Sequence, residues 1–270
     1  MLVFDVLCSL GSRRWLAVPP ILFLAGWLAV DYVQYDFQSQ RARITNVWDG
    51  PLSTMADASL VVFVFVLGFA LVTGDLYVRS LSSGRAAMTL VRARTRDSWW
   101  AAKVGALGVL ALVYSAVSFC SILTASAFRL PLSLEPSKAS EAPWNSPESL
   151  YPRFVELPIP LFFIVVVLYT ALALWAVGAI ILWISVLYPR PVVPATAGLL
   201  WVILGSPLIA PLYQREGVGT LDPMYHVSYV IHFTTSSNQA TPWVSSLSLL
   251  AATLSLVLCA GAWKLRRTDM

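Results

Sequence analysis

Long apolar runs separated by short polar stretches dominate the pattern of this chain. The hydrocarbon core of a bilayer is about 30 Å thick and requires a helix of about 20 residues to cross it. Charge-poor runs of about that length each predict a membrane-spanning helix. The six runs are Trp15–Val33, Ala58–Tyr77, Val104–Phe128, Ile159–Tyr188, Val192–Tyr213 and Trp243–Trp263. The pattern therefore predicts an all-α, polytopic integral membrane protein, a single transmembrane domain over residues 1–270 with about six transmembrane helices.

The segment before the first run, residues 1–14, carries a shorter helical pattern. Apolar positions recur there at i, i+3, i+4 and i+7, and a polar stripe lies opposite them. The apolar positions are Val3, Val6, Leu7 and Leu10, and the polar stripe is Asp5, Ser9 and Ser12. Residues 1–14 are therefore expected to form an interfacial helix along the inner membrane surface. A frayed tail and an extension of the first span are the alternatives.

Composition indicates that the chain lies in lipid, and the distribution of charge predicts its orientation in the membrane. Hydrophobic residues make up 58% of the chain and charged residues 12%, whereas soluble domains carry roughly a quarter charged residues. Basic residues collect on one side of the six runs, the side that faces the cytoplasm in most membrane proteins. Twelve of the 18 lie there: Arg13, Arg14, Arg79, Arg85, Arg92, Arg94, Arg96, Lys103, Arg190, Lys264, Arg266 and Arg267. Both termini are therefore expected in the cytoplasm of a prokaryotic cell, with the protein in its cytoplasmic membrane.

The net charge of +4 is thus an orientation signal. Nucleic-acid binding would require a basic soluble domain, and the pattern predicts none. The opposite side carries two long extracytoplasmic loops, 129–158 and 214–242. The first loop holds six prolines, which exclude a long regular helix, and the second includes an apolar stretch, Met224–Phe233, that predicts a re-entrant or interfacial piece.

The fifth run differs from the others because it contains several helix breakers. Pro194, Pro207 and Pro211 occur with Gly205 in the same run. Proline removes an intrahelical hydrogen bond, so these residues predict a bent or broken helix of the kind that serves gates and binding sites. A short helix that ends near Gly205 is the alternative.

Motifs for catalysis or cofactor binding are missing from the sequence. A P-loop needs a glycine-rich turn that ends in Gly-Lys-Ser/Thr, and a serine hydrolase elbow needs Gly-x-Ser-x-Gly; neither string occurs. Asp222 and His226 are spaced like two helical metal ligands, but histidines that are solvated or packed in the loop are the expected case, as for His232. No catalytic residue, metal site or bound cofactor is therefore predicted on this chain.

Hydroxyl side chains recur along the third run at Ser115, Ser118, Ser121 and Thr124. Such a stripe lines a polar pathway in some transporters, and in others it serves helix packing. Packing is the favoured interpretation here. The three cysteines, Cys8, Cys120 and Cys259, are scattered and form no CxxC motif or disulfide framework.

The loop between the second and third runs, residues 78–103, has a pattern typical of a docking element. Gly84 interrupts the end of the second helix, and Arg85–Val91 predicts a short helix parallel to the membrane. Arginines follow this helix, Trp99 and Trp100 stand where the chain re-enters lipid, and Lys103 is expected to extend back to the headgroups. The residue pattern alone also fits a basic loop that only enforces topology.

The same loop resembles the permease subunits of type-2 ABC transporters. The matching positions are Asp75, Ser83, Gly84, Leu90, Arg94, Arg96, Trp100 and Lys103. Members of that family often carry Glu followed by Gly-Thr near the end of the second span, whereas this chain has Asp75 and a later Ser-Ser-Gly. In that family the loop contains a coupling helix that fits a cleft on the ATPase subunit.

The resemblance implies a function and a set of partners. The chain would be the membrane-spanning subunit of an ATP-driven exporter, paired with a separate ABC ATPase subunit that binds the ATP and with a second permease copy or a paralogue. The implied ATPase contacts are Arg85, Met88, Thr89, Arg92, Arg94, Arg96 and Asp97. Spans without charge favour an amphipathic, lipid-like, drug-like or peptide substrate. The alternatives are an integral membrane enzyme and a non-transporting membrane scaffold or immunity protein.

Overall fold

A computed structural model describes most of the chain, and its described residues form helices and no strand. The described residues are 2–40, 46–56, 60–73, 91, 93, 95–134, 158–190, 192–205, 222–228 and 243–267. The elements are α1 (Leu2–Leu10), α2 (Arg14–Gln40), α3 (Asp49–Ala56), the π-helix η1 (Val61–Leu67), α5 (Gly68–Thr73), α8 (Arg96–Ala127), α9 (Ile159–Leu187), α10 (Val192–Gly205), the 3₁₀ helix η5 (Tyr225–Val227) and α12 (Trp243–Arg266). The predicted all-α class is confirmed for these residues.

Three helices, α8, α9 and α12, are long and apolar enough to cross a membrane. They coincide with the third, fourth and sixth predicted spans. The pair formed by α1 and α2 as far as Val30 is bent by 63° and makes a fourth candidate span. For the second and fifth predicted spans, the described residues end at Thr73 and Gly205, so the total of six spans remains a prediction.

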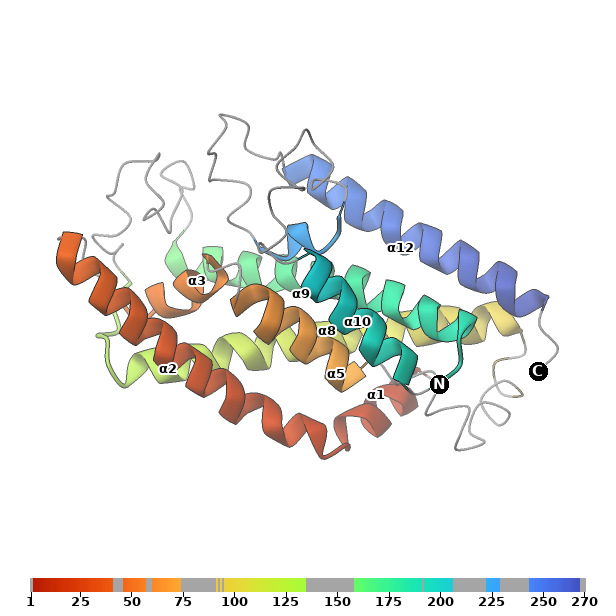
Figure 1. The fold of residues 1–270 in the computed structure, drawn as a ribbon, viewed down its shortest axis with the longest axis horizontal. Coiled ribbons are helices and arrows are strands. Elements are labelled where there is room, and N and C mark those ends of the chain that lie inside the picture. Colours follow the sequence, from red (N-terminus) through yellow and green to blue (C-terminus); the bar gives the residue numbers. More distant parts are fainter. Residues whose placement is uncertain are drawn as a thin grey trace.

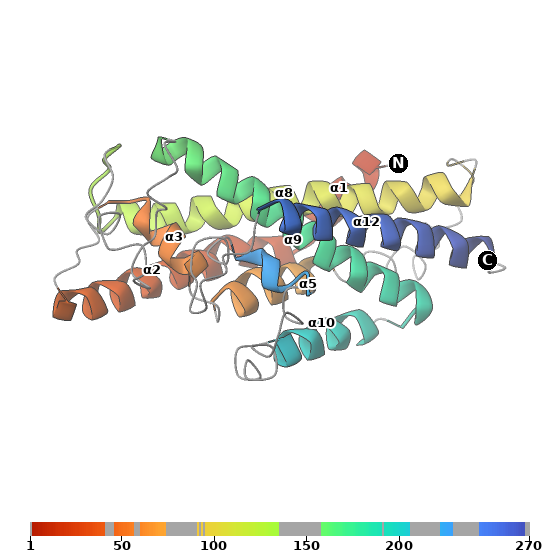
Figure 2. The same ribbon diagram turned by 90° about the horizontal axis from the view of Figure 1, so that it is seen from above.

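The helices form an elongated bundle in which α8 has a central place (Figures 1 and 2). Helices α1, α2, α9 and α12 all pack against α8. Both chain ends lie toward the same end of the long axis as the start of α8, as the two views show. Contacts between the N-terminal, central and C-terminal parts of the chain therefore gather around this one helix.

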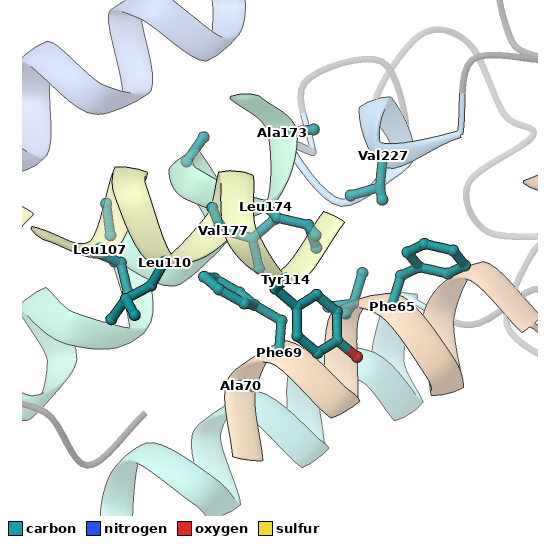
Figure 3. Packing of buried hydrophobic residues seen from close by; sticks show 14 of the residues in the cluster. Phe65, Phe69, Ala70, Leu107, Leu110, Tyr114, Ala173, Leu174, Val177 and Val227 are labelled. Carbon is teal, nitrogen blue, oxygen red and sulfur yellow. The ribbon is translucent and has the colours of Figure 1, made fainter. Parts of the chain in front are cut away.

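Aromatic side chains fill the core between α8 and the second predicted span (Figure 3). Tyr114 of α8 is buried against Phe69 of α5, and its hydroxyl donates a hydrogen bond of 2.7 Å to the carbonyl oxygen of Val64. A Cβ on Gly68 would overlap this hydroxyl. Since π-helical turns free a carbonyl from the regular helix ladder, the tyrosine provides the partner that Val64 needs in an apolar interior.

The hydroxyl stripe of α8 serves the helices themselves. Ser118, Ser121 and Thr124 each donate to the carbonyl oxygen four residues earlier, at distances of 2.6 to 2.8 Å. Ser115 instead donates to the carbonyl oxygen of Val167 in α9, 3.0 Å away. These bonds agree with the packing interpretation of the stripe, because every hydroxyl has a backbone partner.

Short segments around α3 and η5 pack at the end of the bundle near the end of α8. Trp48, just before α3, donates from Nε1 to the carbonyl oxygen of Ser133, which follows α8, over 3.0 Å. Ser228, just after η5, donates to the carbonyl oxygen of Met55 over 2.7 Å. The predicted interfacial piece Met224–Phe233 is described only as far as Ser228, where it contains the buried turn η5.

Candidate coupling site at the start of α8

Two of the predicted ATPase contacts, Arg96 and Asp97, lie in the described structure, in the first turn of α8. The other five, Arg85, Met88, Thr89, Arg92 and Arg94, lie outside the described residues. The prediction of a docking helix at Arg85–Val91 is untested for the same reason. The candidate site is therefore the end of the loop where it becomes α8, together with the residues that surround that end.

Helix α8 starts ahead of the apolar run because Thr95 caps it. Thr95 has an extended backbone, with φ at −134°, and its hydroxyl accepts a hydrogen bond of 3.2 Å from the backbone N–H of Ser98. A threonine in this position satisfies one of the N–H groups that a helix leaves free at its first turn, and the acidic Asp97 in that turn suits the helix dipole. Arg96 and Asp97 are thus presented on a helix.

The first turn of α8 is joined to the last turns of α12. Arg96 donates from Nη1 to the carbonyl oxygen of Leu265 over 2.8 Å. Arg266 donates from Nε to both carboxylate oxygens of Asp97, at 3.0 and 3.1 Å, and its Nη2 donates to the same carboxylate. Asp97 precedes the apolar run that begins near Val104. The hydrogen bond from Arg266 and the positive charge of Arg266 lower the pKa of the Asp97 carboxyl group. The Arg266 side chain is 68% exposed and the Asp97 side chain 42%, so this pair contributes geometry more than stability.

A buried contact continues the joint one turn further along α8. Trp100 is 1% exposed, and its indole N–H donates to the carbonyl oxygen of Val257 in α12 over 3.3 Å. Gly261 of α12 faces the same indole, and a Cβ on this glycine would overlap the ring. The two helices therefore approach closely because the residue opposite the tryptophan has no side chain.

An ion pair attaches α1 to the same part of α8. Lys103 Nζ lies 2.6 Å from Asp5 Oδ1, with the two side chains 1% and 8% exposed, and 5.4 Å from the centroid of the Trp99 ring. The expectation that Lys103 extends to the headgroups is wrong, because a carboxylate from α1 reaches it inside the protein. Likewise Trp99 and Trp100, expected at the lipid surface, are buried.

The orientation of α1 follows from this pair. The polar residues Asp5 and Ser9 are buried together with Val6, whereas Val3, Phe4 and Leu7 are 44–65% exposed. Its polar stripe thus faces the protein, and the side with Val3, Phe4 and Leu7 faces outward. A helix with an apolar outer face suits lipid, since the hydrophobic effect disfavours this face in water.

We call these residues the basal cluster: Asp5 of α1, Arg96, Asp97, Trp100 and Lys103 of α8, and Val257, Gly261, Leu265 and Arg266 of α12. The cluster joins both terminal helices to the helix that follows the loop. It contains charged groups and an indole, but no serine, cysteine or histidine that would act as a nucleophile or base. Its chemistry is therefore suited to holding helices together.

A second polar cluster lies between η5, α9 and α12. His226 Nδ1 is 2.7 Å from Ser246 Oγ, and the ring of Tyr169 in α9 packs against Trp243 at the start of α12. His226 is 1% exposed and Ser246 is 0% exposed. A serine and a histidine at this distance are the components of a nucleophile and base, but burial keeps substrate from the hydroxyl in this conformation. Sequence spacing does not suggest this pair, because its members come from separate elements.

The alternative of a surface metal site at Asp222 and His226 gains no support from the described residues. Asp222 accepts hydrogen bonds from the Trp201 indole N–H, at 3.4 Å, and from the backbone N–H of Met224, at 2.9 Å. His226 faces Ser246 in the interior, and His232 lies outside the described residues. Within the part of the chain that the structure describes, no three His, Cys, Asp or Glu side chains are placed to bind a metal ion.

No protein-family model and no curated protein matches this chain.

Proposed function

We propose that this chain is the membrane-spanning subunit of an ATP-driven transporter, and that a separate ATPase of the ABC type binds the loop at 78–103. The observation that carries the proposal is the basal cluster. The loop leads directly into α8, and the first turns of α8 are attached to α12 through Arg96, Asp97 and Trp100 and to α1 through Lys103. A push on the loop is thereby transmitted to helices at both ends of the chain.

Force transmission needs a stiff attachment, and the contacts of the basal cluster provide one. Trp100 and Lys103 are nearly inaccessible to water. Water therefore does not compete for their polar contacts, and these contacts hold the helices firmly. Closure of the ATPase dimer around ATP would move the loop and shift the spans between two packings, one open to the inside and one to the outside. The permease itself would need no nucleotide site and would catalyse no reaction.

The predicted arrangement in the membrane agrees with this role. Six spans with both termini in the cytoplasm place the loop, the start of α8 and the end of α12 on the side where ATP is available. Helix α1, the end of α12 and the start of α8 lie toward the same end of the bundle, which supports that arrangement (Figures 1 and 2). A second permease copy or a paralogue would complete the pathway, and an amphipathic, lipid-like, drug-like or peptide molecule would be the exported substrate.

The proposal is tested by measuring how much ATPase co-purifies with a variant that has two acids on the predicted docking helix. Met88→Asp with Thr89→Asp leaves every arginine of the loop intact, so the topology signal is unchanged. We expect at least a tenfold lower yield of a P-loop ATPase, identified by mass spectrometry, when the variant is purified from its native membrane. Ser137→Asp with Ser140→Asp adds the same charge to the opposite loop and should leave the yield unchanged.

Two outcomes would contradict the proposal. Full retention of the ATPase and of ATP-dependent transport by the Met88→Asp, Thr89→Asp variant would reduce the loop to a topology signal. A purified chain that turns over a substrate without any partner would instead favour a membrane enzyme.

A further inference from the structure

We infer that the basal cluster makes the start of α8 and the last turns of α12 a single mechanical unit, so that α12 is the helix that the ATPase moves. This inference rests on the proposed function and adds the path by which motion leaves the loop. It also gives Arg266 and Gly261 of α12 a role, although both are far from the loop in sequence.

The contacts between the two helices form an ordered series. Along α8 they come from Arg96, Asp97 and Trp100, which share one side of the first turns. Arg96 and Asp97 contact Leu265 and Arg266, near the end of α12, and Trp100, further along α8, contacts Val257, which lies earlier on α12. The contacts therefore join two antiparallel helices at two levels, and such a joint resists both sliding and rotation.

Beyond this joint, α12 is less enclosed than α8 and α9. Of its most apolar stretch 28% is buried, against 50% for α8 and 61% for α9. The buried residues of α12 are Ser246, Leu250, Leu254, Val257, Gly261 and Leu265, three or four residues apart, so a single narrow stripe touches the bundle. Val244 and Leu256, on the other side, are 74% and 70% exposed. Motion of α12 therefore disturbs little packing, whereas motion of α9 would disturb much more.

A natural cysteine allows the motion of α12 to be followed. Cys259 is exposed on α12, between Val257 and Gly261. With Cys8→Ser and Cys120→Ser, a spin label on Cys259 reports on this helix in the complex of the chain with its ATPase. A second sample, with Cys259→Ser added and the label on Ser83→Cys, reports on the loop. Spectra are recorded with and without ATP.

The variant Arg266→Glu tests the joint, because it places an acid against Asp97 and leaves the loop sequence unchanged. We expect ATP to change the spectra of both labels in the parent complex. Arg266→Glu should reduce the change at Cys259 and keep the change at Ser83, because the contacts of Arg96 and Trp100 with α12 remain. Gly261→Val, which drives α12 away from the Trp100 indole, should act like Arg266→Glu without altering any charge.

The two labels separate failure of the inference from failure of the proposed function. A response at Ser83 without one at Cys259 in the parent complex would overturn the inference and leave the proposed function standing. An unchanged response at Cys259 in both Arg266→Glu and Gly261→Val would also overturn it, because motion would then reach α12 by another path. No response to ATP at either label would remove the proposed function and the inference with it.

Discussion

At the residue scale, the ion pair between Asp5 and Lys103 is the buried ion pair of the basal cluster, with side chains 8% and 1% exposed. Both its desolvation cost and its Coulomb attraction are therefore larger than those of the exposed pair of Asp97 and Arg266. Removing two charges from water is costly, and their mutual attraction offsets that cost only when both partners are present. Asp5 Oδ2 has no hydrogen-bond partner within the described structure, so the carboxylate depends on Lys103 alone. Loss of the cation would leave a buried acid with nothing to stabilise it.

Lys103→Met should therefore lower the free energy of unfolding by about 3–5 kcal/mol, the range for breaking one side of a buried pair. Asp5→Leu combined with Lys103→Met should recover most of this loss, because two apolar side chains then fill the same space. The unfolding midpoint of the purified protein in detergent measures both effects. Arg190→Met, which removes an exposed cation after α9, is the matched control and should change stability by less than about 0.5 kcal/mol. Equal midpoints for Lys103→Met and Arg190→Met would contradict the role of the pair.

At the scale of elements, the close approach of α8 and α12 depends on the match between a large residue and a missing side chain. Trp100 fills the space in front of Gly261, and its indole also bonds to the carbonyl oxygen of Val257. Well-packed interiors do not absorb an added carbon without shifts of the backbone or of rotamers. The position of α12 is therefore sensitive to one methyl group.

Gly261→Ala should destabilise the protein by about 1–3 kcal/mol, because the new Cβ overlaps the indole. The double variant Gly261→Ala with Trp100→Phe should lose less stability than the sum of the losses of the two single variants. The smaller phenylalanine ring leaves room for the methyl group. Ser255→Thr adds one carbon on the exposed side of α12 and should be neutral. Thermal unfolding in detergent measures the three effects, and strict additivity of Gly261→Ala and Trp100→Phe would show that the two residues do not meet.

At the scale of the whole molecule, the distribution of basic residues predicts how the bundle is placed in the membrane. Twelve of 18 Lys and Arg lie on one side of the predicted spans. Moving such residues across a bilayer is unfavourable, so the loops that carry them are predicted to stay in the cytoplasm. The basal cluster includes five charged residues, Asp5, Arg96, Asp97, Lys103 and Arg266, and belongs to this side.

Single cysteines test this orientation in a background with Cys8→Ser, Cys120→Ser and Cys259→Ser. Cysteines at Ser140 and Ser237 should react with a membrane-impermeant thiol reagent in intact cells. A cysteine at Ser83 should react only after the cells are opened, because its loop is predicted to be cytoplasmic. Labelling of Ser83→Cys in sealed cells to the level of Ser140→Cys would reverse the assigned orientation and exclude a cytoplasmic ATPase as the partner of the loop.

The long helices are the part of the fold that local sequence determines. In lipid every backbone polar group needs a partner within its own helix, so the length of an apolar run decides where a helix forms. For this reason the boundaries of α9 and α12 follow the runs that begin at Ile159 and Trp243. The helical spacing of apolar residues before the first run likewise predicts α1, a helix of nine residues. This spacing is a local property of the sequence and can be recognised without knowledge of distant contacts.

Tertiary structure decided which side chains meet. Asp5 with Lys103, Asp97 with Arg266, and His226 with Ser246 join residues 20 to 169 positions apart, and no local pattern records such pairs. One general signal was available for Lys103: an ionisable residue in an apolar helix needs either water or a partner. Sequence alone does not show whether Lys103 is solvated or paired, because the relative free energies of these two states depend on whether another helix packs against Lys103. Only the packing of α1 and α12 on α8 decides it.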